Sequence, residues 1–215
     1  MPTTPEQKAE GWLSVTEVLD AFIPKGLLDW YLKTGRKEAK RLSTVAMKIG
    51  SRVDALIQEE VNTGTFKYNS KDSIEIHNCM EAWKQFKADY SPKILSTQLE
   101  VKSDSEKLVG HIDLIFNNRV VDVKCASSIK PNHWLQVAKY SDMMTTLQMN
   151  ELDNLQEKQR GIAILRLDKN LGTYQFMTHE QAEVNWTECV NVFDGLLGAY
   201  RYYNPPKAVE EVVNE

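Results

Sequence analysis

Three short runs of alternating apolar and polar side chains between residues 94 and 125 constrain the fold of this chain most strongly. Side chains two apart on a strand share a face, so each run predicts a β-strand. The runs cover residues 94–101, 108–116 and 119–125. In the second run, strict alternation places Ile112 and Leu114 on one face. Asn117-Asn118 separates the last two runs, and because Asn tolerates positive φ we predict a tight turn and an antiparallel hairpin.

Three acids and one lysine interrupt these apolar runs. Glu100 ends the first run, Asp113 lies in the second, and Asp122 and Lys124 share a face of the third. Each acid taken alone is typical of a solvated strand end. Together, two carboxylates about 5 Å apart repel by roughly 3 kcal/mol at an effective dielectric of about 20, and one lysine cannot offset three of them. Mg²⁺ accepts carboxylate, water and phosphate oxygens, so the pattern predicts a metal site that cleaves phosphodiesters.

Lys124 has a separate expected role in that chemistry. Its ammonium is a compact charge that can orient an attacking water or stabilise the charge that develops on the phosphate.

The order of the motifs resembles that of the PD-(D/E)XK nuclease superfamily. The matching residues are Gly110-His-Ile-Asp113, then Asp122-Val-Lys124, then Gln136 and Tyr140 on a predicted helix. The likeness is to the RecB-like and lambda-exonuclease-like branch, and within it to the mitochondrial genome maintenance exonuclease and its phage and bacterial relatives. It extends from about Trp12 to Tyr203.

That resemblance implies an α/β fold of the restriction-endonuclease type, in which helices flank a central mixed β-sheet and a helical section forms the N-terminal part. We expect one nuclease domain over residues 1–203, with the helical section at 1–92 and the catalytic core at 93–203. Residues 204–215 read as a disordered acidic tail. With 215 residues and 42% hydrophobic content, the chain can bury one sizeable core.

The resemblance also assigns roles within the site. It implies metal ligation by Asp113, Asp122, Glu100 and the carbonyl of Val123, with Lys124 as the catalytic lysine. Many relatives carry a histidine four residues after a glycine in the upstream helix, and here Asp54 follows Gly50. Asp54 is therefore either a further oxygen ligand or an exposed helix carboxylate. Gln136, Tyr140 and Ser127 are expected to contact the site or the DNA. For Gln136 and Tyr140 the alternative is the polar edge of an ordinary amphipathic helix.

Charge is distributed unevenly along the chain. The net charge is −4, yet residues 25–52 hold eight basic and two acidic residues, which leaves this segment at +6. A basic segment is either a solvated helix face or a surface that follows a phosphate backbone. Next to the nuclease motifs it becomes the expected DNA-holding surface, through Arg36, Lys37, Lys40, Arg41, Lys48 and Arg52. Trp30 and Tyr31 would either stack on unpaired bases or pack in the core.

Hydrophobic spacing predicts the remaining elements. Ser14 caps a first short helix, and Val45 faces the core from a long one. Thr178 caps the last helix, and residues 151–160 read as a mobile connection. The expected helices cover residues 26–33, 38–62, 73–89, 131–148 and 178–203, and the expected later strands cover 161–167 and 172–177.

We therefore expect a Mg²⁺- or Mn²⁺-dependent DNA exonuclease that hydrolyses phosphodiester bonds, with a preference for single-stranded or free ends, in replication, recombination or repair. The exonuclease and single-strand preferences come from the resemblance. Two alternatives remain. One is an endonuclease of the same superfamily, and the other is a catalytically silent DNA-binding module with the nuclease fold.

Cofactor and compartment follow from simpler features. Some relatives hold an iron–sulfur cluster with four cysteines, but Cys79, Cys125 and Cys189 are the only three here, so we predict no cluster. No apolar run approaches the ~20 residues that span a bilayer, and the first residues lack a secretory signal. We expect no membrane contact and a cytoplasmic location, in a bacterial or phage-infected cell.

Overall fold

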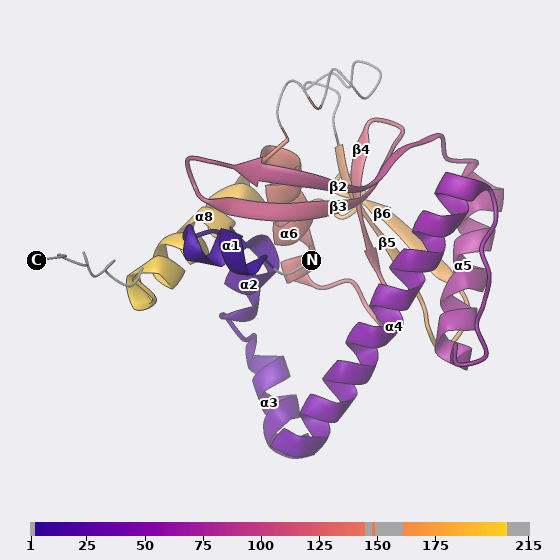
Figure 1. Cartoon of the computed structure of the whole chain (residues 1–215), viewed down its shortest axis with the longest axis horizontal. Coiled ribbons are helices and arrows are strands. Elements are labelled where there is room, and N and C mark those ends of the chain that lie inside the picture. The colour runs from indigo at the N-terminus through magenta and orange to yellow at the C-terminus, as the bar shows by residue number, and fades with distance from the viewer. Residues whose placement is uncertain (1–2, 145–147, 149–160, 206–215) are drawn as a thin grey trace, which may run out of the picture.

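A computed structural model describes residues 3–144, 148 and 161–205. It shows a mixed β-sheet flanked by helices, so the predicted α/β class is confirmed (Figure 1). The helices are α1 (Pro5–Ala9), α2 (Val15–Asp20), α3 (Lys25–Thr34), α4 (Arg36–Thr63), α5 (Ile74–Tyr90), α6 (Pro131–Asp142) and α8 (Trp186–Tyr203). The strands are β1 (Leu13–Ser14), β2 (Ile94–Ser103), β3 (Leu108–Phe116), β4 (Arg119–Lys124), β5 (Gly161–Leu167) and β6 (Tyr174–Thr178). The predicted connection at 151–160 lies outside the described residues, as does the predicted tail from residue 206 on.

The sheet combines antiparallel and parallel pairs. Its order is β1-β3-β4-β5-β6, in which β1 and β4 pair with opposite ends of the same edge of β3. β2 pairs along the other edge of β3. The pairs β2–β3, β3–β4 and β5–β6 are antiparallel, whereas β1–β3 and β4–β5 are parallel. Asn117 and Asn118 have φ of 47° and 57°, which is the left-handed backbone that a tight hairpin turn requires. The predicted β3–β4 hairpin is therefore present.

Two hydrophobic clusters cover the two faces of the sheet. On one face, α2, α6 and α8 pack through residues such as Val137 and Phe193 against Val120 and Ile164. On the other, the second half of α4 and all of α5 pack through residues such as Trp83 against Val121. Figure 1 shows α4 and α5 together at one side of the sheet and α6 and α8 at the other. Val120 and Val121 follow one another and face opposite clusters, as the strand period demands.

Strict alternation fails in the middle of β3. Ile112 packs in the cluster under α6, whereas Leu114 packs in the cluster under α4 and α5. The β2–β3 ladder pairs Leu99 with Ile112 and Thr97 with Leu114, and it skips the two residues between them, Gln98 and Asp113. The prediction that Ile112 and Leu114 share a face was wrong, because the strand is irregular at Asp113.

The N-terminal half of the molecule carries a projection that we call the α3–α4 arch (residues 25–50). It consists of α3 and the first half of α4, which extend from the sheet as a V (Figure 1). The chain reverses at Gly35, whose φ of 82° favours glycine. No residue of α3 is buried. Val45 is 43% exposed, so the prediction that it faces the core was wrong, because this part of α4 lies beyond the sheet.

Several helix boundaries sharpen the sequence predictions. Ser14 does cap α2, since its hydroxyl accepts a hydrogen bond from the backbone N–H of Glu17. The last helix instead begins at Trp186, where Asn185 accepts from the N–H of Glu188. Thr178 accepts from the N–H of Gln181 in a turn before that helix, so its predicted capping role was wrong. α6 ends at Asp142, short of the predicted residue 148.

A buried lysine ties the helices of one face together. Lys139 is 1% exposed on α6, and its ammonium donates to Glu106 and Asp194, each at 2.8 Å, and to Asp142 at 3.3 Å. Glu106 precedes β3 and Asp194 lies on α8, so this ion cluster joins three parts of the chain.

Among the described residues, no helix combines the length and the apolar character needed to cross a bilayer.

Candidate active site

Asp113 lies where three strands come together and one pair separates. The β3–β4 ladder ends at Leu114 and Val121, so Asp113 and Asp122 are the next residues beyond the last pair. One carboxylate oxygen of Asp113 accepts a hydrogen bond from the backbone N–H of Val123 at 2.8 Å. The other accepts from the side-chain amide of Gln98 at 3.3 Å. Asp113 therefore links β3 to β4 through the Val123 N–H and to β2 through the Gln98 amide.

Asp122 and Lys124 form the second part of this site. Their strand pairs in parallel with β5, with Asp122 opposite Ile164 and Lys124 opposite Arg166. Lys124 Nζ donates to Asp122 Oδ1 at 2.7 Å. Asp122 is only 1% exposed, and its Oδ2 is buried without a hydrogen-bond partner in the described structure. A buried carboxyl oxygen without a partner is costly. Asp113 can accept a hydrogen bond from Asp122 only while Asp122 is protonated, so in the ionised form this position favours a cation that would complete it.

The electrostatics of the pair reflect that burial. Burial raises the pKa of Asp122 to about 7; Lys124 opposes this shift and Asp113 adds to it. Burial works to lower the pKa of Lys124, but the carboxylates of Asp122 and Asp113 outweigh it and raise the pKa above its ordinary value. Lys124 therefore stays charged at neutral pH, and its side chain remains 22% exposed.

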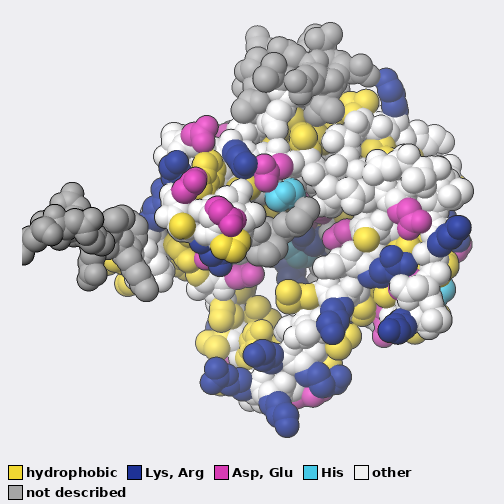
Figure 2. All heavy atoms as spheres, in the orientation of Figure 1, with side chains coloured by type: hydrophobic (Ala, Val, Ile, Leu, Met, Phe, Trp, Pro, Cys, Tyr) yellow, Lys and Arg dark blue, Asp and Glu magenta, His cyan; other side chains and the backbone are white. Residues whose placement is uncertain are grey.

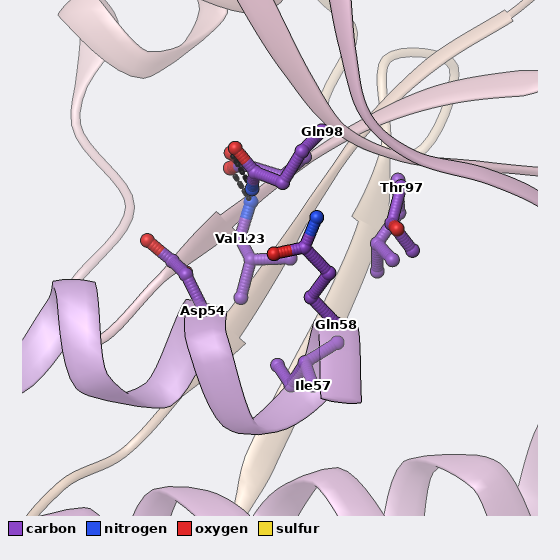
Figure 3. Close-up of a pocket in the computed structure, with 8 residues that line it drawn as sticks. Asp54, Ile57, Gln58, Thr97, Gln98 and Val123 are labelled. Atoms are coloured by element: carbon purple, nitrogen blue, oxygen red, sulfur yellow. Dashed lines mark hydrogen bonds between the residues drawn. The ribbon is translucent and has the colours of Figure 1, made fainter. Parts of the chain in front are cut away.

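Asp54 adds a third carboxylate from α4. It lines a cavity of about 10 Å³ together with Asp113, Gln98 and Val123, a volume that suits one water molecule. Figure 3 shows Asp54 and Gln58 on the same helix, on the side where Val123 and Gln98 lie. Burial raises the pKa of Asp54 to about 7, and the charge of Asp113 adds to the shift. Asp54 thus lies at the site and not on an exposed helix face.

Glu100 does not join this cluster. It is exposed on β2, where its carboxylate pairs with Lys102 at 2.8 Å and lies 3.6 Å from Nε2 of His111. Within the described residues, none of its hydrogen bonds or ion pairs reaches Asp113, Asp122 or Lys124. Gln98, two residues earlier, supplies the β2 contact to Asp113 instead. Its φ of 51° marks the irregularity, and alternation alone gave no sign of it.

Gln136 and Tyr140 do lie together on α6. The Gln136 amide donates to the Tyr140 hydroxyl at 3.0 Å. Tyr140 is 5% exposed, and burial, together with Asp122 and Asp113, raises the pKa of its hydroxyl above the ordinary value. Its ring presses against Gly110, where an added Cβ would lie 2.3 Å from the ring. The glycine three residues before Asp113 therefore makes room for this tyrosine.

A groove of about 1070 Å³ opens from Lys124 toward the arch. Ser127 and Gln136 line it as well, together with Lys124. The remaining lining residues are Thr16, Leu19, Asp20, Pro24, Gly26, Leu27, Trp30, Leu42, Ser43, Ala46, Lys130, Pro131, Asn132, His133 and Lys169. Sequence reasoning missed Asp20, Lys130, His133 and Lys169, because they lie in three separate stretches that only the fold brings together.

The pKa values of two of these residues respond to the charges that line the groove. Burial, together with the charges of Lys124 and Lys130, lowers the pKa of His133 to about 4. Burial raises the pKa of Asp20, whereas Lys124 works to lower it. The start of α6 therefore carries a positive potential, to which the helix dipole also contributes.

The six basic residues predicted to hold DNA, five in the arch and Arg52 just beyond it, are placed differently from the expectation. Arg52 makes a two-pronged ion pair with Asp72, at 2.9 and 3.0 Å, and also donates to the carbonyl of Lys67. Arg52 therefore anchors the loop after α4 to α4 itself. The run of basic residues in the sequence gave no indication of this structural role. Arg41 pairs with Glu38 at 2.6 Å. Among the described ion pairs, none involves the other four: Arg36, Lys37, Lys40 and Lys48.

The cations predicted to contact DNA are not among the described residues that line the groove. Figure 2 shows Lys and Arg side chains gathered on the outside of the arch.

The donor set at the site fits a hard divalent cation only in part. In the described part of the chain, no group of three or more His, Cys, Asp or Glu side chains is arranged to hold a metal ion. Mg²⁺, however, often takes only one or two carboxylates and completes its shell with water and substrate phosphate. Asp113 and Asp122, with the unpartnered Oδ2 of Asp122, match that requirement.

Comparisons with known proteins give distant structural likenesses. No protein-family model matches the chain, and no curated protein sequence matches it. The fold is similar to that of an alkaline exonuclease (LHK-Exo) from Laribacter hongkongensis, with a TM-score of 0.35, 13% identity, and coverage of 94% of this chain and 96% of that one. A structure of LHK-Exo in complex with dAMP gives a TM-score of 0.28 and 13% identity, over 72% of this chain and 82% of that one.

Proposed function

We propose that this protein is a metal-dependent DNA exonuclease of the PD-(D/E)XK type, which hydrolyses phosphodiester bonds from single-stranded ends. One observation carries the proposal. The buried Oδ2 of Asp122 has no partner in the described structure, and it lies beside Lys124 where the β3–β4 hairpin opens. A structural ion pair would satisfy both of its oxygens, whereas a site that receives a ligand leaves one available.

Asp113 and Asp122 would hold a Mg²⁺ or Mn²⁺ ion, with the Val123 carbonyl as a further oxygen donor. Asp54 lines the adjacent water-sized cavity and would reach the ion through a water molecule. When bound, such an ion polarises the phosphate and lowers the pKa of a coordinated water. The Val123 N–H and the Gln98 amide fix the Asp113 carboxylate, so that its orientation is set before substrate arrives. Glu100 has no part in this proposal, since its carboxylate is engaged with Lys102.

Lys124 would act on the phosphate itself. Its ammonium stays charged, because the two carboxylates raise its pKa, and the side chain lines the groove. A fixed positive charge at this position stabilises the negative charge that develops on the phosphoryl oxygens. Gln136 also lines the groove, where its amide could orient the strand while it holds the Tyr140 hydroxyl.

An endonuclease with the same residues would perform the same chemistry without needing an end. A timed digestion separates these possibilities: single- and double-stranded DNA, labelled at the 5′ or the 3′ end, is compared with circular single-stranded DNA in Mg²⁺, Mn²⁺ or EDTA. We expect linear single strands to shorten from one end, circles to persist and EDTA to abolish the reaction. Cleaved circles would favour the endonuclease. A lack of cleavage in both metals would favour the silent DNA-binding module and contradict the proposal.

A further inference from the structure

The lining of the groove divides according to the element that supplies it. The sheet side, formed by the end of β4, the start of α6 and the β5–β6 turn, is polar and basic through Lys124, Lys130 and Lys169. The opposite side, formed by α2 and the arch, is largely apolar and presents Leu27, Trp30 and Leu42, with Asp20 as the one acid among the described lining residues. No lysine or arginine of the arch is among the described lining residues. The two sides therefore differ in chemistry.

The basic side is available to an anion. Lys130 is exposed and Lys169 is part-exposed, and neither forms an ion pair with another described residue. Lys130 immediately precedes α6, where the helix dipole adds to its charge, and Lys169 lines the same groove from the β5–β6 turn. The lowered pKa of His133, which comes from burial and then from Lys124 and Lys130, is consistent with a positive field here.

The apolar side of the groove leaves large hydrophobic side chains exposed to solvent. Leu27 is 38% and Leu42 is 37% exposed, although both lie within a concave surface. Trp30 is half-buried and meets Tyr31 edge to face at 5.1 Å, while the Tyr31 hydroxyl lies 3.4 Å from that of Ser43. The two neighbouring aromatic residues therefore have different roles, which the sequence did not distinguish. Trp30 lines the groove, whereas Tyr31 contacts α4.

We propose that the groove binds a single DNA strand in one orientation, with its phosphates on Lys130 and Lys169 and its bases against Leu27, Trp30 and Leu42. This inference rests on the proposed nuclease function for its choice of ligand and deepens it. A strand has one charged edge and one set of flat apolar faces, which matches the two sides of the groove. In a duplex the base faces are stacked and paired inside, so the apolar side would select for unpaired bases. The predicted basic residues on the outside of the arch are not needed.

Binding measured in EDTA tests the orientation without any cleavage. A labelled oligothymidine is compared with an abasic strand of the same length, which keeps every phosphate and lacks every base. We expect the oligothymidine to bind at least about tenfold more tightly, because base stacking on apolar side chains adds to affinity. The Leu27→Ala/Leu42→Ala double variant should lose most of that difference. Leu32→Ala is the matched control, because Leu32 is 74% exposed on the same helix outside the groove lining.

The salt dependence of binding tests the basic side. Lys130→Ala and Lys169→Ala should each reduce the slope of log affinity against log salt by about 0.7, equally for both strands. Lys37→Ala and Lys40→Ala, which remove cations from the arch outside the groove lining, should leave the slope unchanged. Thermal midpoints within experimental error of the wild type establish that each variant is folded.

Two results would overturn this inference. One is equal affinity for the oligothymidine and the abasic strand, and the other is a slope that falls with Lys37 and Lys40 but not with Lys130 and Lys169. Normal cleavage alongside either result would leave the nuclease function standing. Conversely, the expected binding pattern without cleavage in Mg²⁺ or Mn²⁺ would uphold the groove and refute the nuclease.

Discussion

Two lysine–carboxylate clusters lie under the same face of the sheet, and they differ in which partner is buried. At Lys139 the ammonium is buried, and its three carboxylate partners, Glu106, Asp142 and Asp194, have side chains 28%, 47% and 45% exposed. At Lys124 the carboxylate of Asp122 is buried, with its side chain at 1%, and the lysine is 22% exposed.

The two clusters also differ in how completely they are satisfied. Lys139 uses three donors on three carboxylates, each of which can also be hydrated. Asp122 uses one oxygen on Lys124 and leaves the other buried without a described partner. A satisfied ion cluster stabilises a fold, whereas an incompletely satisfied one at a groove is typical of a functional site. The difference predicts three contrasting responses to mutation and pH.

The largest expected effect is on cleavage. Lys124→Ala and Asp122→Asn should each reduce the rate of digestion of end-labelled single-stranded DNA at least about 1000-fold, because each removes a charge aimed at the reacting phosphate or its metal. Asp194→Asn, which alters a carboxylate of the other cluster, should stay within about twofold of the wild type. Comparable losses in Asp194→Asn and Asp122→Asn would erase the distinction between the clusters.

The next effect is on stability. Lys139→Met keeps an unbranched side chain of similar length but removes the charge that holds three carboxylates together. We expect the free energy of unfolding in urea to fall by about 2–4 kcal/mol, since partly buried carboxylates lose their partner. The cleavage rate of the remaining folded protein should be unchanged. An unaltered urea midpoint would show that this cluster contributes little to the fold.

The smallest effect is the pH dependence of stability without metal. The folded pKa of Asp122 is raised to about 7, mainly by burial, so between about pH 4 and pH 7 the folded state binds more protons than the unfolded state. Stability should therefore fall as pH rises through this window, on the order of 2 kcal/mol, and level off above it. Asp122→Asn should reduce this slope, and part of it should remain because burial also raises the pKa of Asp54 to about 7. Added Mg²⁺ should flatten the wild-type profile. Urea unfolding at each pH, in EDTA for the metal-free protein and in excess Mg²⁺ for the other series, would show both effects.

The Lys139 cluster should respond in the opposite direction. Burial works to raise the pKa of Glu106, but hydrogen bonds from Lys139 and Ser103 outweigh it and hold the pKa below its ordinary value. This contribution to stability is present above the ordinary pKa of Glu and is lost as pH falls through the lowered one. If stability rose with pH through both windows, or fell with pH through both, the proposed difference between the Asp122 and Lys139 clusters would be contradicted.

Much of the fold followed from local rules. The β3–β4 hairpin followed from two asparagines and two alternating runs. The helices expected at 26–33 and 38–62 end close to Gly35 and Gly64, both of which have positive φ. The failures have a common cause in long-range packing. Val45 carries a helical core spacing, but the sheet does not extend as far as its part of α4. Thr178 has the chemistry of a cap, and it uses that chemistry in a turn.

The candidate site was predictable where the order of motifs along the chain fixes the geometry. Asp113, Asp122 and Lys124 meet because a two-residue turn joins their strands. Glu100 was selected for its charge, yet an irregularity at Gln98 brings an amide to Asp113 in its place. The groove could not be predicted, because Asp20, Lys130 and Lys169 lie far apart in sequence and only the fold brings them together.

The most direct test of the contrast is a Mn²⁺ titration followed by the electron paramagnetic resonance signal of the free ion. It compares wild type, Asp122→Asn and Asp194→Asn at the same protein concentration and pH. The account predicts that wild type and Asp194→Asn remove Mn²⁺ from solution equally, and that Asp122→Asn weakens this binding at least about tenfold. Binding by Asp122→Asn that matches the wild type would contradict it.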